Sequence, residues 1–159
     1  ICNIWLNDGV STYTPVSPTL PKDRADQIAE AALICYPPGS FFTSIVANLL
    51  VEGVSGAIVK NLNPKIYLPN LGDDPEQQGW GVMDRVRYLI SMLLGDEPES
   101  NAQSRVLDWL LLDDTYDYGD LDEGLLESWG VQVVKTPLVT SKPDRYDEQL
   151  VVHALLSFV

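Results

Sequence analysis

A short run of glycine and hydroxyl residues is the part of this sequence whose residue types could do chemistry. Gly39, Ser40, Thr43 and Ser44 follow an apolar run at 31–35 and open an apolar helical pattern at 45–51. A strand, a tight turn and a helix in that order bring together the first helical N–H groups, which have no partner inside the helix. The helix dipole adds partial positive charge there. The pattern therefore predicts an anion site in the 39–44 loop, with phosphate as the favoured anion.

The same residue types also suit an ordinary turn that ends in a helix cap. On composition alone that structural interpretation is slightly favoured. A second candidate, Asn70, stands where the next apolar run, 64–69, ends. Its amide could hydrogen-bond a sugar or a base, or it could cap the turn into Leu71, and the sequence leaves both open.

Acidic residues are dense after two of the expected strands. Asp73 and Asp74 could hold a divalent cation bound to a diphosphate, because hard cations prefer carboxylate oxygen. A solvated acidic loop is the favoured interpretation of that pair. A second group follows around Asp113, without the spacing of a calcium-binding loop. There a structural role is favoured, and Asp120 or Asp122 is expected to cap the helix that comes next.

Other reactive residue types have plain explanations. His153 is the single histidine, and the sequence places no Ser or Cys beside it to form a triad, so a surface or interface histidine is expected. Trp80 lies between two glycines and could stack on a base, although lid-like packing is equally compatible. Cys2 and Cys35 lie in apolar runs and are expected to be buried free thiols.

Composition limits the class of partner. The 159 residues are 45% hydrophobic and carry a formal net charge of −13. Binding to nucleic acid or to an anionic membrane needs a basic face, so neither is expected to be the main partner. No apolar run approaches the roughly 18–20 residues of a membrane span, and the first residues do not resemble a signal peptide. We expect a cytoplasmic protein.

Strand-like and helix-like patterns alternate along the chain, which predicts an α/β fold in a single domain, 1–159. The expected sheet is doubly wound, mostly parallel and Rossmann-like, with helices on both faces. In such sheets ligands bind beyond the carboxyl ends of the strands, where the candidate residues would lie. The expected strands are 1–7, 31–36, 64–69, 105–112 and 131–135, and the expected helices are 21–30, 43–59, 82–94, 120–128 and 147–158.

The residues from Leu33 to Leu50 read LICYPPGSFFTSIVANLL. This resembles the motif of the 2-phospho-L-lactate transferase (CofD-like) family, which also contains the YvcK-like gluconeogenesis factors and is also called UPF0052. Its members typically read Gly-Pro-Gly-Ser-Leu-Tyr-Thr-Ser-Ile, then an Asn-Leu-Leu helix and a strand that ends in Asn-Leu. The Asn-Leu pair here is Asn70-Leu71. The resemblance implies the C-terminal portion of a CofD-like domain.

The chain departs from the family pattern in three places. The Gly-rich phosphate loop of the family's N-terminal half is absent from this sequence. Tyr36-Pro37 replaces the first glycine of the Gly-Pro-Gly-Ser motif, and residues 72–78 replace the usual Thr-Gln-Pro-Gly-Glu-Thr stretch. The first two differences count against the family's activity in this chain alone, and the third indicates a divergent branch with a different ligand or none.

The resemblance implies a transferase-type protein that binds a phosphorylated or nucleotide-diphosphate ligand. Gly39, Ser40, Thr43 and Ser44 would hold phosphate and Asn70 would orient the ligand, while the catalytic group is unassigned. Mg²⁺ would assist, and no organic cofactor is expected. The transferred group would be of the phospholactyl type.

Two alternatives stay open. One is a non-catalytic regulator of metabolism or cell-envelope synthesis that binds a nucleotide sugar, as the YvcK-like branch implies. The other is an interaction module whose site has decayed. The expected partners are the small ligand and the missing N-terminal half or a partner chain, and a homodimer through a helix or an edge strand is a further expectation.

Overall fold

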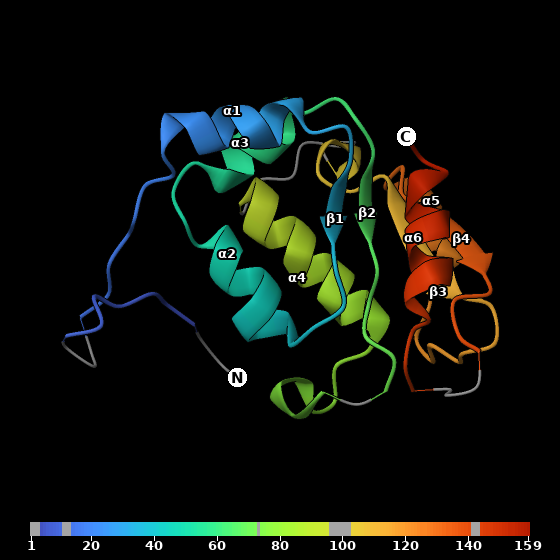
Figure 1. The fold of residues 1–159 in the computed structure, drawn as a ribbon. Coiled ribbons are helices and arrows are strands. Elements are labelled where there is room, and N and C mark those ends of the chain that lie inside the picture. Colours follow the sequence, from blue (N-terminus) through green and yellow to red (C-terminus); the bar gives the residue numbers. More distant parts are fainter. Residues whose placement is uncertain (1–3, 11–13, 73, 96–102, 141–143) are drawn as a thin grey trace.

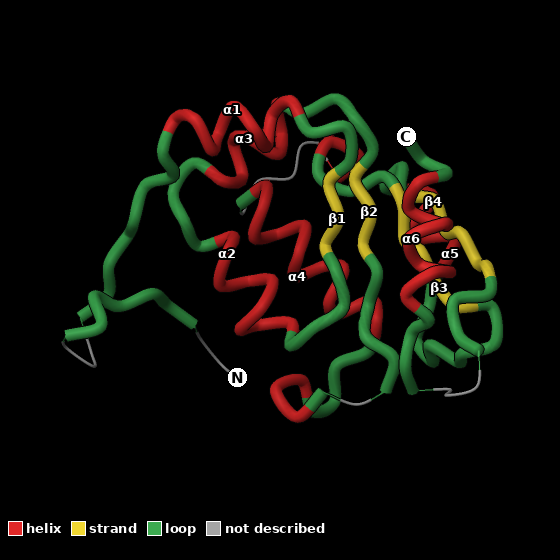
Figure 2. The backbone as a smooth tube through the Cα atoms, viewed as in Figure 1, coloured by secondary structure: helices red, strands yellow, loops and turns green. Residues whose placement is uncertain are grey.

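The computed structural model describes residues 4–10, 14–72, 74–95, 103–140 and 144–159. Four strands form one parallel sheet in the order β1–β2–β3–β4 (Figures 1 and 2). Their bounds are Ile34–Tyr36 for β1, Lys65–Tyr67 for β2, Trp109–Asp113 for β3 and Gln132–Thr136 for β4. The register pairs Cys35 with Ile66 and Leu110 with Val133. The α/β class and the parallel sheet are as predicted.

The strand expected at 1–7 is wrong for the residues that the structure describes, and residues 1–3 lie outside them. Asn7 makes one isolated antiparallel bridge to Pro15, and the Val16 N–H donates to the Leu6 carbonyl at 2.9 Å. The prolines of the returning segment have no N–H to donate, which prevents a continuous ladder. This segment lies away from the sheet in Figure 1.

The helices cover both faces of the sheet, as expected. Their bounds are α1 Lys22–Glu30, η1 Phe41–Val46, α2 Ala47–Leu49, α3 Val54–Lys60, η2 Pro75–Gln77, α4 Val82–Leu94, η3 Gln103–Arg105, α5 Glu123–Ser128 and α6 Glu148–Leu156. The helix expected at 43–59 begins two residues earlier, as the π-helical turn η1. It breaks before α3 at Gly53, where a φ of 96° suits glycine.

Two hydrophobic cores lie on opposite faces of the sheet. The larger core packs η1, α3, α4 and α5 against one face. The smaller core lies beneath α6 on the other face, where the rings of Trp109 and Phe158 are 5.2 Å apart. Its fully buried members are Ile66, Leu68, Leu111 and Leu138. Burial of both faces accounts for the continuous apolar runs of these strands.

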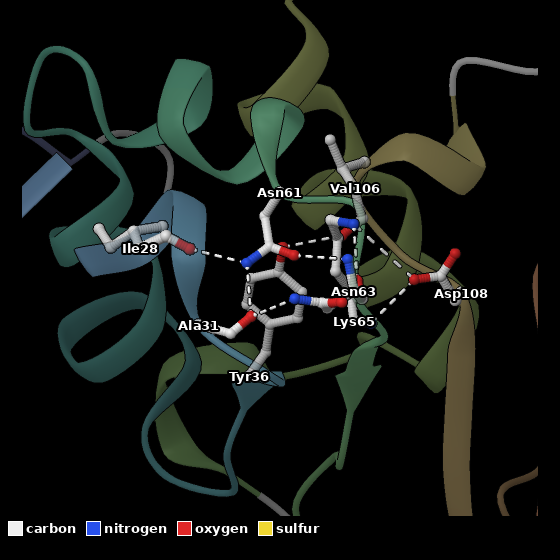
Figure 3. A network of polar contacts seen from close by, with 8 residues as sticks. All are labelled: Ile28, Ala31, Tyr36, Asn61, Asn63, Lys65, Val106 and Asp108. Atoms are coloured by element: carbon white, nitrogen blue, oxygen red, sulfur yellow. Dashed lines mark hydrogen bonds and ion pairs between the residues drawn. The ribbon is translucent and has the colours of Figure 1, made fainter. Parts of the chain in front are cut away.

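A polar network fastens the segments that lead into the strands (Figure 3). The buried Asn61 amide donates to the carbonyls of Ile28 and Ala31, both at 2.8 Å, and so ties α3 to the end of α1. The Lys65 ammonium, which is 3% exposed, donates to the Asn63 carbonyl at 3.0 Å. Burial lowers the pKa of Lys65 although Asp108 opposes the shift. The network lies at the amino ends of the strands, opposite the expected ligand side.

Candidate functional site

The turn between β1 and η1 has the geometry that the sequence predicts. Four residues separate the end of β1 at Tyr36 from the start of η1 at Phe41, and η1 runs directly into α2. Phe41 and Phe42 are buried in the larger core, whereas Thr43 and Ser44 are exposed. The alternation of apolar and hydroxyl residues therefore buries one side of the turn and leaves the hydroxyl groups on the surface.

Asn70 closes this turn from the end of β2. Its side-chain oxygen accepts from the Gly39 N–H at 2.5 Å, and its side-chain nitrogen donates to the Gly39 carbonyl at 2.6 Å. The amide thus binds both main-chain groups of one residue 31 positions away. The predicted residues Gly39 and Asn70 are brought together, although neither interpretation of Asn70 from the sequence included this contact.

Ser40 follows Gly39 directly, and Ser44 approaches it from the next turn of the chain. Ser40 occupies the N-cap position of η1, but its side chain makes no capping hydrogen bond there. The Ser44 N–H donates to the Ser40 carbonyl at 2.8 Å. A Cβ atom added to Gly39 would lie 3.3 Å from the Ser44 Cβ, which is tight contact. The small residue at position 39 therefore fits the close approach of Ser44.

Two carboxylates accept hydrogen bonds from main-chain N–H groups at the start of η1. Asp74 accepts from the Phe41 N–H at 3.2 Å. Glu76 accepts from the Thr43 N–H at 3.4 Å and from the Thr43 hydroxyl at 2.9 Å. Both acids come from the loop after β2, where Asp74 also caps η2 by accepting from the Glu76 N–H. The expectation of a solvated loop is therefore wrong for Asp74, and Asp73 lies outside the described residues.

The buried Gln77 side chain lies beside these carboxylates. Its amide nitrogen donates to Asp74 at 2.9 Å, on the same carboxylate oxygen that accepts from Phe41. Its amide oxygen is buried and has no hydrogen-bond partner, while the residue is 4% exposed. A buried acceptor without a donor is costly in a folded protein. The loop after β2 is thus the least satisfied part of the site.

Trp80 packs on the outside of the turn. Its ring lies 5.3 Å from Phe42 and 5.4 Å from Tyr88, both in edge-to-face geometry. Such pairs stabilise an aromatic cluster beyond the area that they bury. Of the two expectations for Trp80, the structure matches lid-like packing.

The acidic residues after β3 have structural roles, as expected. Asp113 is 2% exposed and accepts from the Leu138 N–H at 2.7 Å and from the Thr115 hydroxyl at 2.6 Å. Asp122 caps α5 by accepting from the Leu125 N–H. Asp120 caps α4 instead, which the sequence did not indicate because the two lie 38 residues apart.

The remaining reactive side chains do not join the turn. His153 is exposed on α6, as predicted. Cys35 is a free, partly buried thiol, and burial raises its pKa to about 11, so it is a poor nucleophile. Cys2 lies outside the described residues. Tyr36, which departs from the family motif, is buried and donates its hydroxyl to the Val106 carbonyl at 2.8 Å.

The described residues do not form a metal site on their own. No three Asp, Glu, His or Cys side chains among them come close enough to hold an ion. Asp74 and Glu76 could contribute two carboxylates to a cation that arrives with a phosphate ligand, which is how Mg²⁺ is commonly held. In the described part of the chain, no helix is both long and apolar enough to span a membrane.

Comparison with known proteins agrees with the motif and the fold. The family model described as "2-phospho-L-lactate transferase CofD" matches residues 9–139, which is more than half of the chain. The chain belongs to the CofD family. The gluconeogenesis factor of Bacillus subtilis is 27% identical over 149 residues, covering 86% of this chain and 46% of that protein. A relative from Aquifex aeolicus is 27% identical over 167 residues, covering all of this chain and 49% of that protein.

A solved structure supports the same fold. The crystal structure of a UPF0052 family member from Bacillus halodurans superposes with a TM-score of 0.69 at 22% identity, covering 87% of this chain and 46% of that one. At this identity the likeness concerns the fold alone. The chain spans about half the length, or less, of the relatives and the solved structure that it matches.

Proposed function

We propose that this CofD-family chain is the phosphate-binding portion of a transferase that acts on a nucleoside-diphosphate type of ligand. The observation that carries the proposal is the pair of carboxylates on the amides of Phe41 and Thr43. Each reaches across 33 residues to place anionic oxygen at the start of η1. The first turn of a helix attracts phosphate for the same reason, through free N–H groups and the helix dipole.

A phosphate would take the place of Asp74 and Glu76. It would accept from the Phe41 and Thr43 amides and from the Thr43 hydroxyl, with Ser40 and Ser44 as further hydroxyl donors. Gly39, held by Asn70, keeps the turn in shape, and the Asn70 amide would orient the ligand. These groups would contribute positioning and charge neutralisation to the transfer of a phospholactyl-type group. Mg²⁺, if bound with the diphosphate, would neutralise its charge.

Calorimetric titration with inorganic pyrophosphate and with a uridine diphosphate sugar tests the site. The variants Ser40→Ala and Thr43→Ala remove hydroxyl donors and should each weaken binding about 2- to 10-fold. Ser157→Ala is the matched control, because its hydroxyl donates to the Ala154 carbonyl at the end of α6 and should leave the affinity unchanged. Binding that neither Ser40→Ala nor Thr43→Ala alters would contradict the assignment.

The names of the relatives favour a second candidate, a regulator of metabolism, and the resemblance to the YvcK-like branch implies that it binds a nucleotide sugar without turning it over. One matched relative is named a gluconeogenesis factor, which describes a metabolic role and no chemical reaction. The two functions differ in turnover. Binding of the uridine diphosphate sugar without release of a nucleoside phosphate would favour the regulator, and group transfer to an alcohol acceptor would favour the transferase.

We further propose that the other half of a full-length relative adds a strand beside β1. In the described residues β1 pairs with β2 alone and lies at the edge of the sheet. A groove of 610 Å³ runs along β1, lined mainly by apolar side chains such as Ile28, Leu33 and Leu49. An edge strand presents unpaired main-chain N–H and C=O groups with which another strand can pair.

Native mass spectrometry of the purified protein tests this partner. A second, different polypeptide in the complex would support it. A multiple of the 17.6 kDa chain mass would instead indicate a homo-oligomer. The 17.6 kDa chain alone would contradict both.

A further inference from the structure

Tyrosine side chains from two neighbouring loops hold the main chain on both sides of Asn70. The Tyr146 hydroxyl donates to the Pro69 carbonyl at 2.6 Å. The Tyr116 hydroxyl accepts from the Gly72 N–H at 2.8 Å. Asn70 thus lies within a four-residue stretch that is fixed at each end, although Tyr146 is 77 residues away from Pro69.

The two tyrosines are themselves attached to the sheet through Tyr118. Its hydroxyl accepts from the main-chain N–H of Asp113, the last residue of β3, at 2.9 Å. The rings of Tyr116 and Tyr118 are 4.8 Å apart in edge-to-face contact, and the hydroxyls of Tyr118 and Tyr146 lie close enough for each to influence the pKa of the other. Burial raises the pKa of both Tyr118 and Tyr146, so their hydroxyls stay protonated and able to donate.

The consequence for the turn is geometric. Asn70 makes two short hydrogen bonds to Gly39, and a hydrogen bond weakens steeply with small changes of distance and angle. A loop free to move would hold that pair only part of the time, since ordering its main chain costs conformational entropy. Hydrogen bonds from rigid neighbours hold the main chain of this loop in place before a ligand binds.

We infer that Tyr116, Tyr118 and Tyr146 are positioning residues, which fix the loop after β2 so that Asn70 keeps the Gly39 turn in its anion-binding shape. The inference rests on the proposed function, because it assigns these tyrosines a role at the phosphate site. The amides of Phe41 and Thr43 donate to Asp74 and Glu76 and not to these tyrosines. The tyrosines act through Asn70.

A double-mutant cycle on affinity for inorganic pyrophosphate tests this route. Tyr146→Phe removes one hydroxyl and should weaken binding about 2- to 10-fold, measured well below the melting temperature of each variant. Asn70→Ala should weaken binding at least as much. The double variant should bind no more weakly than Asn70→Ala alone, because the two residues act in series. Independent, additive losses would overturn the inference. Tyr88→Phe, in the aromatic cluster around Trp80, is the matched control and should leave the affinity unchanged.

Hydrogen exchange without any ligand separates this inference from the proposed function. If the loop is held as inferred, Tyr146→Phe should speed exchange of the Gly39 amide several-fold, whereas Tyr88→Phe should not change it. Equal exchange in wild type and Tyr146→Phe would overturn the positioning role. A wild-type protein that binds neither pyrophosphate nor the uridine diphosphate sugar would contradict the proposed function, and the exchange rates would still decide the role of the tyrosines.

Discussion

The first turns of η1 and α4 are both capped by carboxylates from distant loops, but the two caps are built differently. At α4, the two oxygens of Asp120 accept from consecutive amides, Val82 at 2.8 Å and Met83 at 3.2 Å. At η1, the Phe41 and Thr43 N–H groups donate to two different acids, Asp74 at 3.2 Å and Glu76 at 3.4 Å. One cap is a single bidentate carboxylate, and the other is a pair of longer contacts.

Space around the two caps differs as well. A Cβ atom on Gly81, the residue before α4, would overlap the Asp120 carboxylate. No side chain fits between them, and a ligand has no more room than a side chain. The Thr43 and Ser44 positions of η1 are exposed, so an incoming anion can reach them. A helix N-terminus is a candidate anion site when an incoming anion can replace the carboxylate that caps it. The start of η1 meets this condition, and the start of α4 does not.

Gly81→Ala should have the largest effect of the changes considered, because the new methyl group must displace Asp120. The variant loses two charge-assisted hydrogen bonds, and we expect the free energy of unfolding to fall by about 2–3 kcal/mol. Urea unfolding measures this. The matched control is Gly56→Ala in α3, where a Cβ meets open space and the free energy of unfolding should rise by about 0.5–1 kcal/mol. Equal stability of Gly81→Ala and wild type would show that Asp120 is free to move.

Removing the caps themselves should sharpen the contrast. Asp120→Ala should lower the free energy of unfolding by about 1–2 kcal/mol, as loss of a good N-cap does. Glu76→Ala should lower it by no more than about 0.5 kcal/mol, because its contacts with Thr43 are exposed. Thermal or urea unfolding of both variants under one set of conditions makes the comparison. A larger loss for Glu76→Ala would mean that the η1 cap is structural.

Local patterns predicted the elements that position these caps. The helix at Val82–Leu94 has the bounds predicted from the sequence, because its apolar residues recur at helical spacing and glycines precede and follow it. The 39–44 turn was predictable for a similar reason, since Gly, Ser and Thr follow a strand and precede an apolar helix. The apolar run at the start of the chain misled, because hydrophobicity alone does not say whether a strand finds a partner.

The contacts that define the site could not be predicted in this way. Asp120 meets α4 from 38 residues away, Glu76 meets Thr43 from 33 and Tyr146 meets Pro69 from 77. These separations carry no periodic signal, and each residue type has common alternative roles on a surface. Only the packing of the loops at the carboxyl ends of the strands brings these residues together.

Asp113 is a second carboxylate that, like Asp120, is held by several hydrogen bonds. The pH dependence of stability tests whether its charge contributes. Burial alone would raise its pKa, but hydrogen bonds from Thr115 and from the main chain of Leu138 and Val139 outweigh burial and hold the pKa below the ordinary value of an aspartate. A folded-state pKa below the unfolded value means that the carboxylate stabilises the protein above that range. This stability is lost as the pH falls through the folded pKa.

Wild type should therefore exceed Asp113→Asn in free energy of unfolding at pH 7, by a margin that shrinks toward pH 2. Urea unfolding of both proteins at several pH values measures the margin. Asp117→Asn is the control, because Asp117 is an exposed acid of the same loop. A margin independent of pH would show that Asp113 acts through its shape and not its charge.

The expected effect on ligand affinity bears most directly on whether a ligand can displace the η1 cap. Glu76→Gln removes the negative charge that competes for the Thr43 amide, and a neutral amide accepts a hydrogen bond more weakly than a carboxylate does. Affinity for pyrophosphate, measured by calorimetry, should therefore rise about 3- to 10-fold, which corresponds to roughly 0.7–1.4 kcal/mol.

Net charge alone would also raise affinity for an anion, so the control must remove the same charge elsewhere. Glu127→Gln does so on an exposed position of α5 and should change affinity by less than a factor of about two at physiological salt. A gain in affinity that occurs only in Glu76→Gln would show that Glu76 and the ligand compete for the Thr43 amide. A loss in Glu76→Gln would mean that the carboxylate helps to bind the ligand, and η1 would then resemble α4 in having an acid that stays in place.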